Sequence, residues 1–445
     1  MAETSARTTK VFAWGGNVFD QIHFDHPRTS APYTVPDAAA ILAICAYQTV
    51  VRSHSGQIRA LGEAARLLEQ AIQTILDDDN DADSSGLVFV GQDMFEAVLD
   101  VRRKRCCFLR YVEEEEEEER GSSEMVEGSS WETAACDGRG RCMAFDLDGK
   151  VYLFDSVAMF RAATGQGEDA VRLRDAKRFV AQVFSPDGSS SSSAPTMLPR
   201  FDTVSAGNAH FVLLARSSNE VCPVWIYGDA RFGAVPLRPF DHTTTVGVLP
   251  PSHSPSTPAP TDVPHLMPVP HFSPDQGFPS RIANAIAGSR HTLVLTADGD
   301  LYGWGWNEDS ALLPFHTTAD TPSWENNIVF EPTLIPLPSA AAGKDDTVAL
   351  TKIAGSNARS LGITTEGRLV VAGSNEFGGL ALDEEQLGAL AKKPRFERAF
   401  SQIKKAYECV NGWQLHPELG AAQGATVVQV HATALATFIT VEMEQ

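Results

Sequence analysis

The feature that most constrains this chain is internal repetition. Residues 286–307 form an apolar run, a turn at Asp298-Gly299 and a second apolar run that ends in Trp304-Gly305. Asp-Gly between two apolar runs is typical of a β-hairpin, because glycine adopts a positive φ at little cost. A chain that repeats this hairpin along its length is predicted to build a series of similar small sheets.

Copies of this unit lie on both sides of it. The clearest copies begin at Val204 and Ile353, and more divergent ones begin at Ile44 and Ala135. A residue that recurs once per unit indicates a packing arrangement that is repeated. We interpret the recurring residues as structural positions of the repeat: Trp14, Gly15, Gly207, His210, Gly288, His291, Asp298, Gly299, Trp304, Gly305, Gly355 and Gly367.

The two ends of the chain each carry half a unit. Residues 11–17 hold only its second part, and residues 428–441 hold only its first part. If the last strands pair with the first, a ring closes and leaves no exposed sheet edge. We therefore predict an all-β ring of repeated small sheets whose final sheet combines both ends. Six units are evident, and we place a degenerate seventh between Leu87 and Leu109.

Long stretches separate the repeats, and we interpret them as loop insertions in a single domain that spans residues 1–445. Glu63–Leu76 has apolar residues at helical spacing. We predict a loop helix packed on the ring there, with a partner-binding helix as the alternative. The low-complexity or acidic insertions are placed at about 77–86, 113–130, 185–197 and 249–280.

Motifs for catalysis are absent from the sequence. It contains no phosphate-binding loop, no His-Glu-x-x-His and no Gly-x-Ser-x-Gly. His210 and His291 share one repeat position, which Gln48, Arg141 and Ala358 occupy elsewhere. Such variety argues against shared chemistry, and we expect each histidine to be held within its own blade. We predict no catalytic residue, no cofactor and no metal site, and therefore no enzymatic activity.

Charge narrows the class of partner. The chain has 36 Lys and Arg against 57 Asp and Glu, a net charge of −21. Such a protein repels phosphate backbones, so general nucleic-acid binding is disfavoured. Ala391–Trp413 departs from this trend, because it interleaves basic and aromatic residues in a pattern that fits RNA or an acidic protein. Its candidate partner-binding residues are Lys392, Lys393, Arg395 and Arg398.

Cysteine usage and hydropathy indicate the compartment. The seven cysteines are odd in number and include no Cys-x-x-Cys pair, which is typical of reduced thiols in the cytosol or nucleus. The apolar run Ala38–Tyr47 is about half the length of ~20 residues that a membrane-spanning helix needs. Residues 1–10 lack the apolar stretch of a secretory signal. We expect a cytoplasmic or nuclear monomer without a membrane partner.

Residues 281–307 resemble the regulator-of-chromosome-condensation repeat almost throughout, and residues 202–228 resemble its first half. The shared pattern is an apolar residue and Ala-Gly-x-x-His, then a strand, Asp-Gly, and Tyr-x-Trp-Gly-x-Asn. Proteins of this family form seven-bladed propellers with four-stranded blades. The resemblance therefore implies that this chain is an all-β, seven-bladed β-propeller closed by its N- and C-terminal strands in one blade. In the family the repeat histidine is usually structural.

The resemblance leaves several functions open. The chain looks most like the small members, such as the alpha-tubulin-suppressor type, which binds a small zinc-binding partner and supports diphthamide synthesis and Elongator-dependent tRNA wobble-uridine modification. Another small member escorts an oxygenase to chromatin, and the phrase Gly303–Asn307 fits both. The founding member is a guanine-nucleotide exchange factor for a Ran-like GTPase, which the acidic charge disfavours. We expect a non-catalytic scaffold that binds proteins through a propeller face and its loops.

Overall fold

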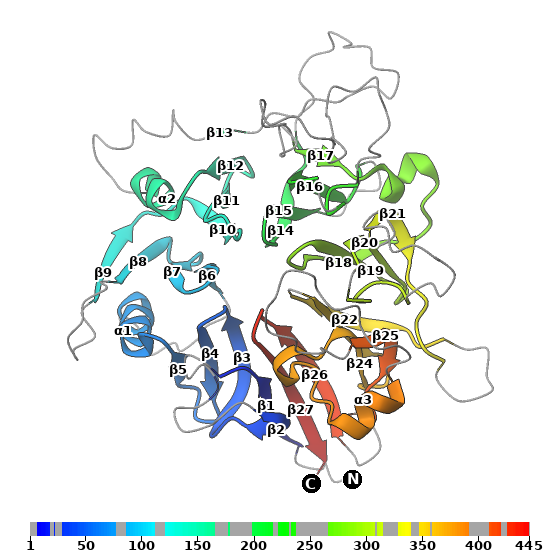
Figure 1. Cartoon of the computed structure of the whole chain (residues 1–445). Helices are drawn as coiled ribbons and strands as arrows, with labels where there is room; N and C mark the ends of the chain where they lie inside the picture. Colours follow the sequence, from blue (N-terminus) through cyan, green and yellow to red (C-terminus); the bar gives the residue numbers. More distant parts are fainter. Residues whose placement is uncertain are drawn as a thin grey trace, which may run out of the picture.

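Seven antiparallel sheets are arranged in a ring in the computed structural model (Figure 1). The all-β ring predicted from the repeats and the seven-bladed propeller implied by the family resemblance are confirmed. In each sheet the strand named first below lies nearest the centre of the ring, and the last lies at the periphery (Figure 1). The structure describes residues 7–17, 22, 29–76, 86–111, 121–164, 177–178, 198–216, 221–230, 233–236, 266–307, 309–314, 328–339, 347–356, 358–390, 409–419 and 425–444.

The first three blades follow one another in chain order. Blade 1 contains β3 (Ala38–Ile44), β4 (Gln48–Ser53) and β5 (Ile58–Gly62). Blade 2 contains β6 (Leu87–Gly91), β7 (Phe95–Asp100), β8 (Arg105–Tyr111) and β9 (Gly121–Glu127). Blade 3 contains β10 (Trp131–Cys136), β11 (Cys142–Asp146), β12 (Val151–Phe154) and β13 (Lys177–Arg178).

The remaining blades complete the ring. Blade 4 contains β14 (Phe201–Ala206), β15 (His210–Ala215), β16 (Val224–Gly228) and β17 (Met267–Pro268). Blade 5 contains β18 (Ile282–Ala287), β19 (His291–Thr296), β20 (Leu301–Trp306) and β21 (Ile328–Leu334). Blade 6 contains β22 (Leu350–Gly355), β23 (Arg359–Thr364), β24 (Leu369–Ser374) and β25 (Cys409–Leu415). Blade 7 contains β26 (Ala425–Ala432), β27 (Ala436–Glu444), β1 (Arg7–Gly15) and β2 (Thr29–Thr34).

Blade 7 joins the two ends of the chain, as the half-units predicted. β1 pairs antiparallel with β27 over its full length of nine residues, from Arg7 opposite Glu444 to Gly15 opposite Ala436. Phe438 lies opposite Ala13 and is fully buried in a core shared with blade 1. The pairing therefore closes the ring with both hydrogen bonds and apolar contacts, and neither strand keeps an open edge at this join.

The degenerate unit placed between Leu87 and Leu109 is a complete blade, blade 2. Its outer strand β9 lies inside the interval 113–130, which the sequence analysis assigned to an insertion. Likewise β17 and two 3-10 helices, η3 (Pro270–Phe272) and η4 (Pro274–Gln276), lie inside the interval 249–280. The outer strand β9 pairs on one side only and is mostly exposed, so its apolar pattern is weak. Residues 77–85, 112–120, 185–197 and 249–265 lie outside the described residues.

A helix takes the place of a fourth strand in blade 1. The helix predicted over Glu63–Leu76 is α1 (Ala65–Leu76), which packs Leu68 and Ile72 into a core shared by blades 1 and 2. A carboxylate oxygen of Glu69 accepts a hydrogen bond of 2.9 Å from the backbone N–H of Ala60 on β5. The helix thus covers the edge of β5, in agreement with a loop helix packed on the ring.

The apolar core is divided among the junctions between blades. Seven clusters of buried side chains fill these junctions, and Trp304 between blades 4 and 5 is typical of them. Two shorter helices, α2 (Val157–Thr164) and α3 (Glu384–Leu390), and the 3-10 helix η6 (Glu376–Gly378) lie in loops. Within the described ranges no helix has the length and hydropathy of a membrane-spanning segment.

Truncation of the buried aromatic side chain where β1 pairs with β27 should destabilise the whole propeller. We expect Phe438→Ala to lower the free energy of unfolding by about 3–5 kcal/mol, because it removes a fully buried aromatic side chain and leaves a cavity. Urea unfolding followed by tryptophan fluorescence measures this loss. Leu334→Ala, at a residue that is 54% exposed, is the control and should change stability by less than about 0.5 kcal/mol. Equal effects of the two substitutions would contradict the closure.

Candidate functional site

One repeat position occupies the same place in successive blades, at the start of the second strand. His210 and His291 begin β15 and β19, and Gln48 begins β4. In each case the loop before it closes with a backbone hydrogen bond that this residue's carbonyl accepts, as in the 2.8 Å bond from Gly288 N–H to the His291 carbonyl. We call the side chains at this position the belt residues: Gln48, Arg141, His210, His291 and Arg359.

The position in blade 6 differs from the sequence-based assignment. Arg359 pairs with Gly373 as His291 pairs with Gly305, so Arg359 is the equivalent residue and Ala358 lies one position before it. Counting from the Ala-Gly pair gave Ala358, because β22 runs one residue further than β18 does before the loop begins. A long cationic side chain therefore replaces histidine at the belt position of blade 6.

The belt side chains reach into the neighbouring blade, whereas the sequence analysis expected each to be held within its own blade. His210 Nε2 lies 3.2 Å from Thr292 Oγ1 in blade 5, and His291 Nε2 lies 3.0 Å from Ser360 Oγ in blade 6. The other members also contact the next blade, but through different groups. Gln48 Oε1 accepts from Phe95 N–H in blade 2 at 2.7 Å. Arg141 Nη2 donates to the Ala209 carbonyl in blade 4 at 3.1 Å, and Arg359 Nη2 donates to the Ala434 carbonyl in blade 7 at 3.3 Å.

Burial fixes the charge state of the two belt histidines. Each is 1% exposed. Burial lowers the pKa of His210 to about 3 and that of His291 to about 4. The Thr292 hydroxyl donates to the Ala234 carbonyl at 3.3 Å, so it accepts from the neutral ring of His210. A ring with so low a pKa and no access to solvent is unsuited to general base catalysis at neutral pH.

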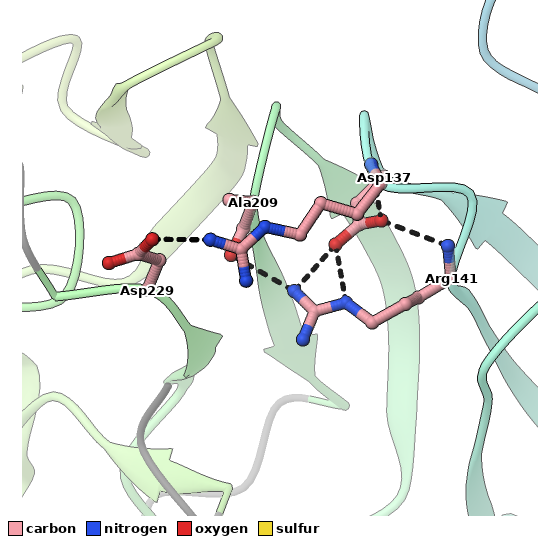
Figure 2. A network of polar contacts seen from close by, with 5 residues as sticks. Asp137, Arg141, Ala209 and Asp229 are labelled. Atoms are coloured by element: carbon pink, nitrogen blue, oxygen red, sulfur yellow. Dashed lines mark hydrogen bonds and ion pairs between the residues drawn. The ribbon is translucent and has the colours of Figure 1, made fainter. Parts of the chain in front are cut away.

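Four charged side chains form a network at the junction of blades 3 and 4 (Figure 2). Arg141 Nε and Nη2 donate to one carboxylate oxygen of Asp137, at 2.8 and 2.6 Å. Arg139 forms an ion pair with Asp229 of blade 4. Asp137 and Asp229 are 0% and 2% exposed, so each buried carboxylate has a guanidinium partner. The network joins the two blades and leaves only part of Arg139 at the surface.

The other predicted repeat residues have structural contacts. Trp14 Nε1 donates to the Gly379 carbonyl and Trp304 Nε1 to the Ala234 carbonyl, at 3.0 and 2.8 Å. Gly305 has a φ of +105°, and a Cβ there would meet the Arg290 carbonyl oxygen at 2.6 Å, so only glycine fits. Related positions are Gly15 beside the Leu435 carbonyl, Gly207 and Gly288 against the rings of His210 and His291, Gly299 and Gly367 in tight turns, Gly355 at the end of β22, and Asp298, which accepts from Ser280 Oγ.

The residues that the belt side chains contact in the next blade were not predicted from the sequence. Thr292 and Ser360 each directly follow the belt residue of their own blade and contact the belt histidine of the preceding blade. A hydroxyl residue after the repeat position, also present at Thr49 and Thr437, was the available signal. The candidate partner-binding residues Lys392, Lys393, Arg395 and Arg398 lie outside the described residues. In the part of the chain that the structure describes, no three His, Cys, Asp or Glu side chains converge as a metal site.

Exchange of His291 for the residue that blade 1 uses tests the belt chemistry. The pKa of His291 is about 4 in the fold, against 6.5 for an ordinary histidine. Between these values the unfolded chain binds a proton that the fold excludes, so stability falls as pH falls, by up to about 1.4 kcal/mol per pH unit from this residue. We expect His291→Gln to reduce the pH slope of the unfolding free energy between pH 6.5 and 5. Parallel unfolding at pH 8 separates any packing cost, and an unchanged slope would refute the assignment.

Removal of a buried carboxylate should cost far more than removal of an exposed one. Asp137→Ala leaves the nearly buried Arg141 without its ion pair, and we expect a loss of about 3–5 kcal/mol in unfolding free energy. Asp202→Ala is the matched control, because its ion pair with Arg216 is 50% and 43% exposed and contributes about 0–1 kcal/mol. Thermal denaturation of both variants provides the comparison. A loss below about 1 kcal/mol for Asp137→Ala would mean that the network does not hold blades 3 and 4 together.

Comparison with known proteins supports the same fold. Residues 287–310 match the model of the regulator of chromosome condensation (RCC1) repeat. Yeast RCC1 (Prp20), in a structure bound to Kap60, superposes with a TM-score of 0.58 at 14% identity, covering 99% of this chain and 90% of that one. Human WBSCR16 superposes with a TM-score of 0.52 at 14% identity, covering 97% and 98%. No curated protein matches in sequence.

The matched residues include the belt position of blade 5, since they contain Gly288, His291, Asp298 and Trp304. The family model thus confirms the resemblance at residues 287–310, and the superpositions confirm the propeller fold. The chain is a seven-bladed β-propeller in which residues 287–310 match the regulator of chromosome condensation repeat.

Proposed function

We propose that this protein is a non-catalytic scaffold that binds protein partners through the periphery of its ring. The observation that carries the proposal is the belt. The polar side chains that the repeats bring into equivalent positions are buried and bonded to the next blade. They stabilise the ring and are not presented to a substrate. What differs from blade to blade lies at the rim, where α1, α2 and the η3–η4 segment are attached (Figure 1).

The comparison structures support a protein partner. A propeller of this fold, yeast RCC1 (Prp20), was solved in complex with the protein Kap60. A chain of net charge −21 attracts basic partner segments and repels acidic ones. We propose a monomer that binds in the cytoplasm or nucleus, because all seven cysteines are buried free thiols, as is usual in reducing compartments. The segment with Lys392, Lys393, Arg395 and Arg398 remains a proposed second contact for an acidic partner.

The identity of the partner rests on the sequence resemblance alone. The small members suggest a small zinc-binding protein, with a role as accessory factor in diphthamide synthesis and Elongator-dependent tRNA wobble-uridine modification. The alternative partners are an oxygenase brought to chromatin and a Ran-like GTPase. The partner recovered by affinity purification and the result of a nucleotide-release assay distinguish these alternatives.

Affinity purification of the full-length protein, followed by chemical cross-linking and mass spectrometry, tests the scaffold. We expect at least one stable protein partner, with cross-links that map to the peripheral elements. A parallel assay measures the release of labelled nucleotide from a panel of GTPases, and we expect no acceleration. Absence of any stable partner would contradict the scaffold, and accelerated nucleotide release would replace it with exchange activity.

A further inference from the structure

A cavity of about 430 Å³ lies at the junction between blade 4 and blade 5. Its walls come from the segment that follows β17 and from Tyr302 of β20. We call it the aromatic slot, and its lining residues are Pro270, His271, Gln276, Gly277, Phe278, Pro279 and Tyr302. The segment with η3 and η4 is an addition to the repeat, so the slot is specific to this junction.

The rings of the slot form a platform. The centroid of His271 lies 5.3 Å from that of Tyr302 and 5.7 Å from that of Phe278, and Phe278 lies 5.5 Å from Tyr302. Beneath them the buried ring of Phe272 contacts Trp304 of the blade core. Rings in mutual contact leave no enclosed space between them for a cation. Their outer faces instead offer a rigid apolar surface on which a flat ligand group can lie.

The platform continues onto the outer strand of blade 5. Leu334 of β21 lies directly opposite Tyr302 of β20, so the two side chains share one face of the sheet. Leu334 is 54% exposed and is the exposed large hydrophobic side chain among the described residues. Exposed apolar surface beside a preformed cavity is typical of a binding site.

Carboxylates border the apolar surface. Glu331 on β21 is exposed and acts electrostatically on the ring of His271, whose pKa it raises against the larger lowering effect of burial. Asp300 directly precedes β20, and its charge raises the pKa of Tyr302 in addition to the larger effect of burial. The rim of the slot is therefore acidic, in keeping with the net charge of the whole chain. A ligand that fits both features is apolar in its centre and positively charged at one end.

We propose that the aromatic slot binds a proline-containing, extended peptide segment of a partner protein, with a lysine or arginine beside the proline that pairs with Glu331. The proposal rests on the proposed scaffold function and names the class of its partner. Proline rings stack well on aromatic faces, and a polyproline II segment arrives already extended, so little conformational entropy is lost on binding.

The lining of the slot favours this occupant over a paired β-strand or an amphipathic helix. Pro270 and Pro279 lack backbone N–H groups, so a strand laid along this segment would lose hydrogen bonds there. A polyproline II segment makes no regular backbone pairs and does not need them. An amphipathic helix requires a long continuous groove, whereas this cavity spans a few side chains of ligand.

Binding of designed peptides to the full-length protein tests the proposal. The probe is a fluorescein-labelled decapeptide with several prolines and a lysine at one end, measured by fluorescence anisotropy. Two control peptides replace the lysine by glutamate or the prolines by alanine. We expect each control to bind about tenfold more weakly than the probe. Hydrogen–deuterium exchange should show protection by the probe at residues 270–279 and 301–306.

Variants locate the binding on the slot. His271→Ala and Leu334→Ser change exposed side chains, so both variants should fold, and each should weaken binding of the probe about tenfold. Glu331→Lys should reverse the preference, so that the glutamate peptide binds better than the lysine peptide. Asp148→Lys on blade 3 is the matched control, since it makes the same change of charge at a residue that is 73% exposed, and it should leave binding unchanged.

Three results would overturn the proposal. One is equal binding of the three peptides, and another is unchanged binding by the slot variants. The third is binding that appears only after Pro255, Pro258 and Pro260 are replaced by alanine, which would make this chain's own proline-rich segment the occupant. If the slot variants still capture the protein partner found by affinity purification, the slot is wrong but the scaffold function stands. Loss of that partner together with the probe would support both.

Discussion

The structure depends on the pairing of β1 with β27. A single blade is a small twisted sheet that cannot bury both of its faces, so each one needs a neighbour on either side. The apolar clusters accordingly lie at the junctions between blades, and Phe438 beside Ala13 belongs to the one that joins blades 7 and 1. Because blade 7 takes strands from both ends, the chain cannot complete its last junction until its first and last strands meet. Stability at every other junction then gains from a closed ring with no open end.

The belt gives five of the seven junctions a polar contact in addition to their apolar core. An amide, an imidazole and a guanidinium perform the same task at this position, since each places a hydrogen-bonding group far enough from the backbone to reach the next blade. The choice of group has an energetic consequence. Arg359 is buried with Nε and Nη1 lacking hydrogen-bond partners among the described residues, and burial lowers its pKa to about 10. Neutral Gln48 and His291 meet the same requirement without a buried charge.

The inner strands of most blades were predictable from the sequence and the outer strands were not, for a physical reason. Strands such as β19 are buried on both faces and joined to the next by an Asp-Gly turn, so their signal is strong. β9 is exposed along most of its length, and its residues were therefore read as an insertion. The recurrence of His210 and His291 was visible, but their partners Thr292 and Ser360 lie 82 and 69 residues away along the chain. Spacing within one repeat carries no information on such contacts between repeats.

The same division bears on where recognition can take place. Side chains at the belt are committed to neighbouring blades, so a change there alters the ring before it alters any partner. The η3–η4 segment is under no such constraint, since it lies outside the repeated strands and packs on blade 5 through Phe272 while His271 faces solvent. The buried ring holds the platform on blade 5, and the exposed ring contacts the ligand. Because His271, Gln276 and Leu334 are exposed, substitutions at these positions can change binding without loss of the fold.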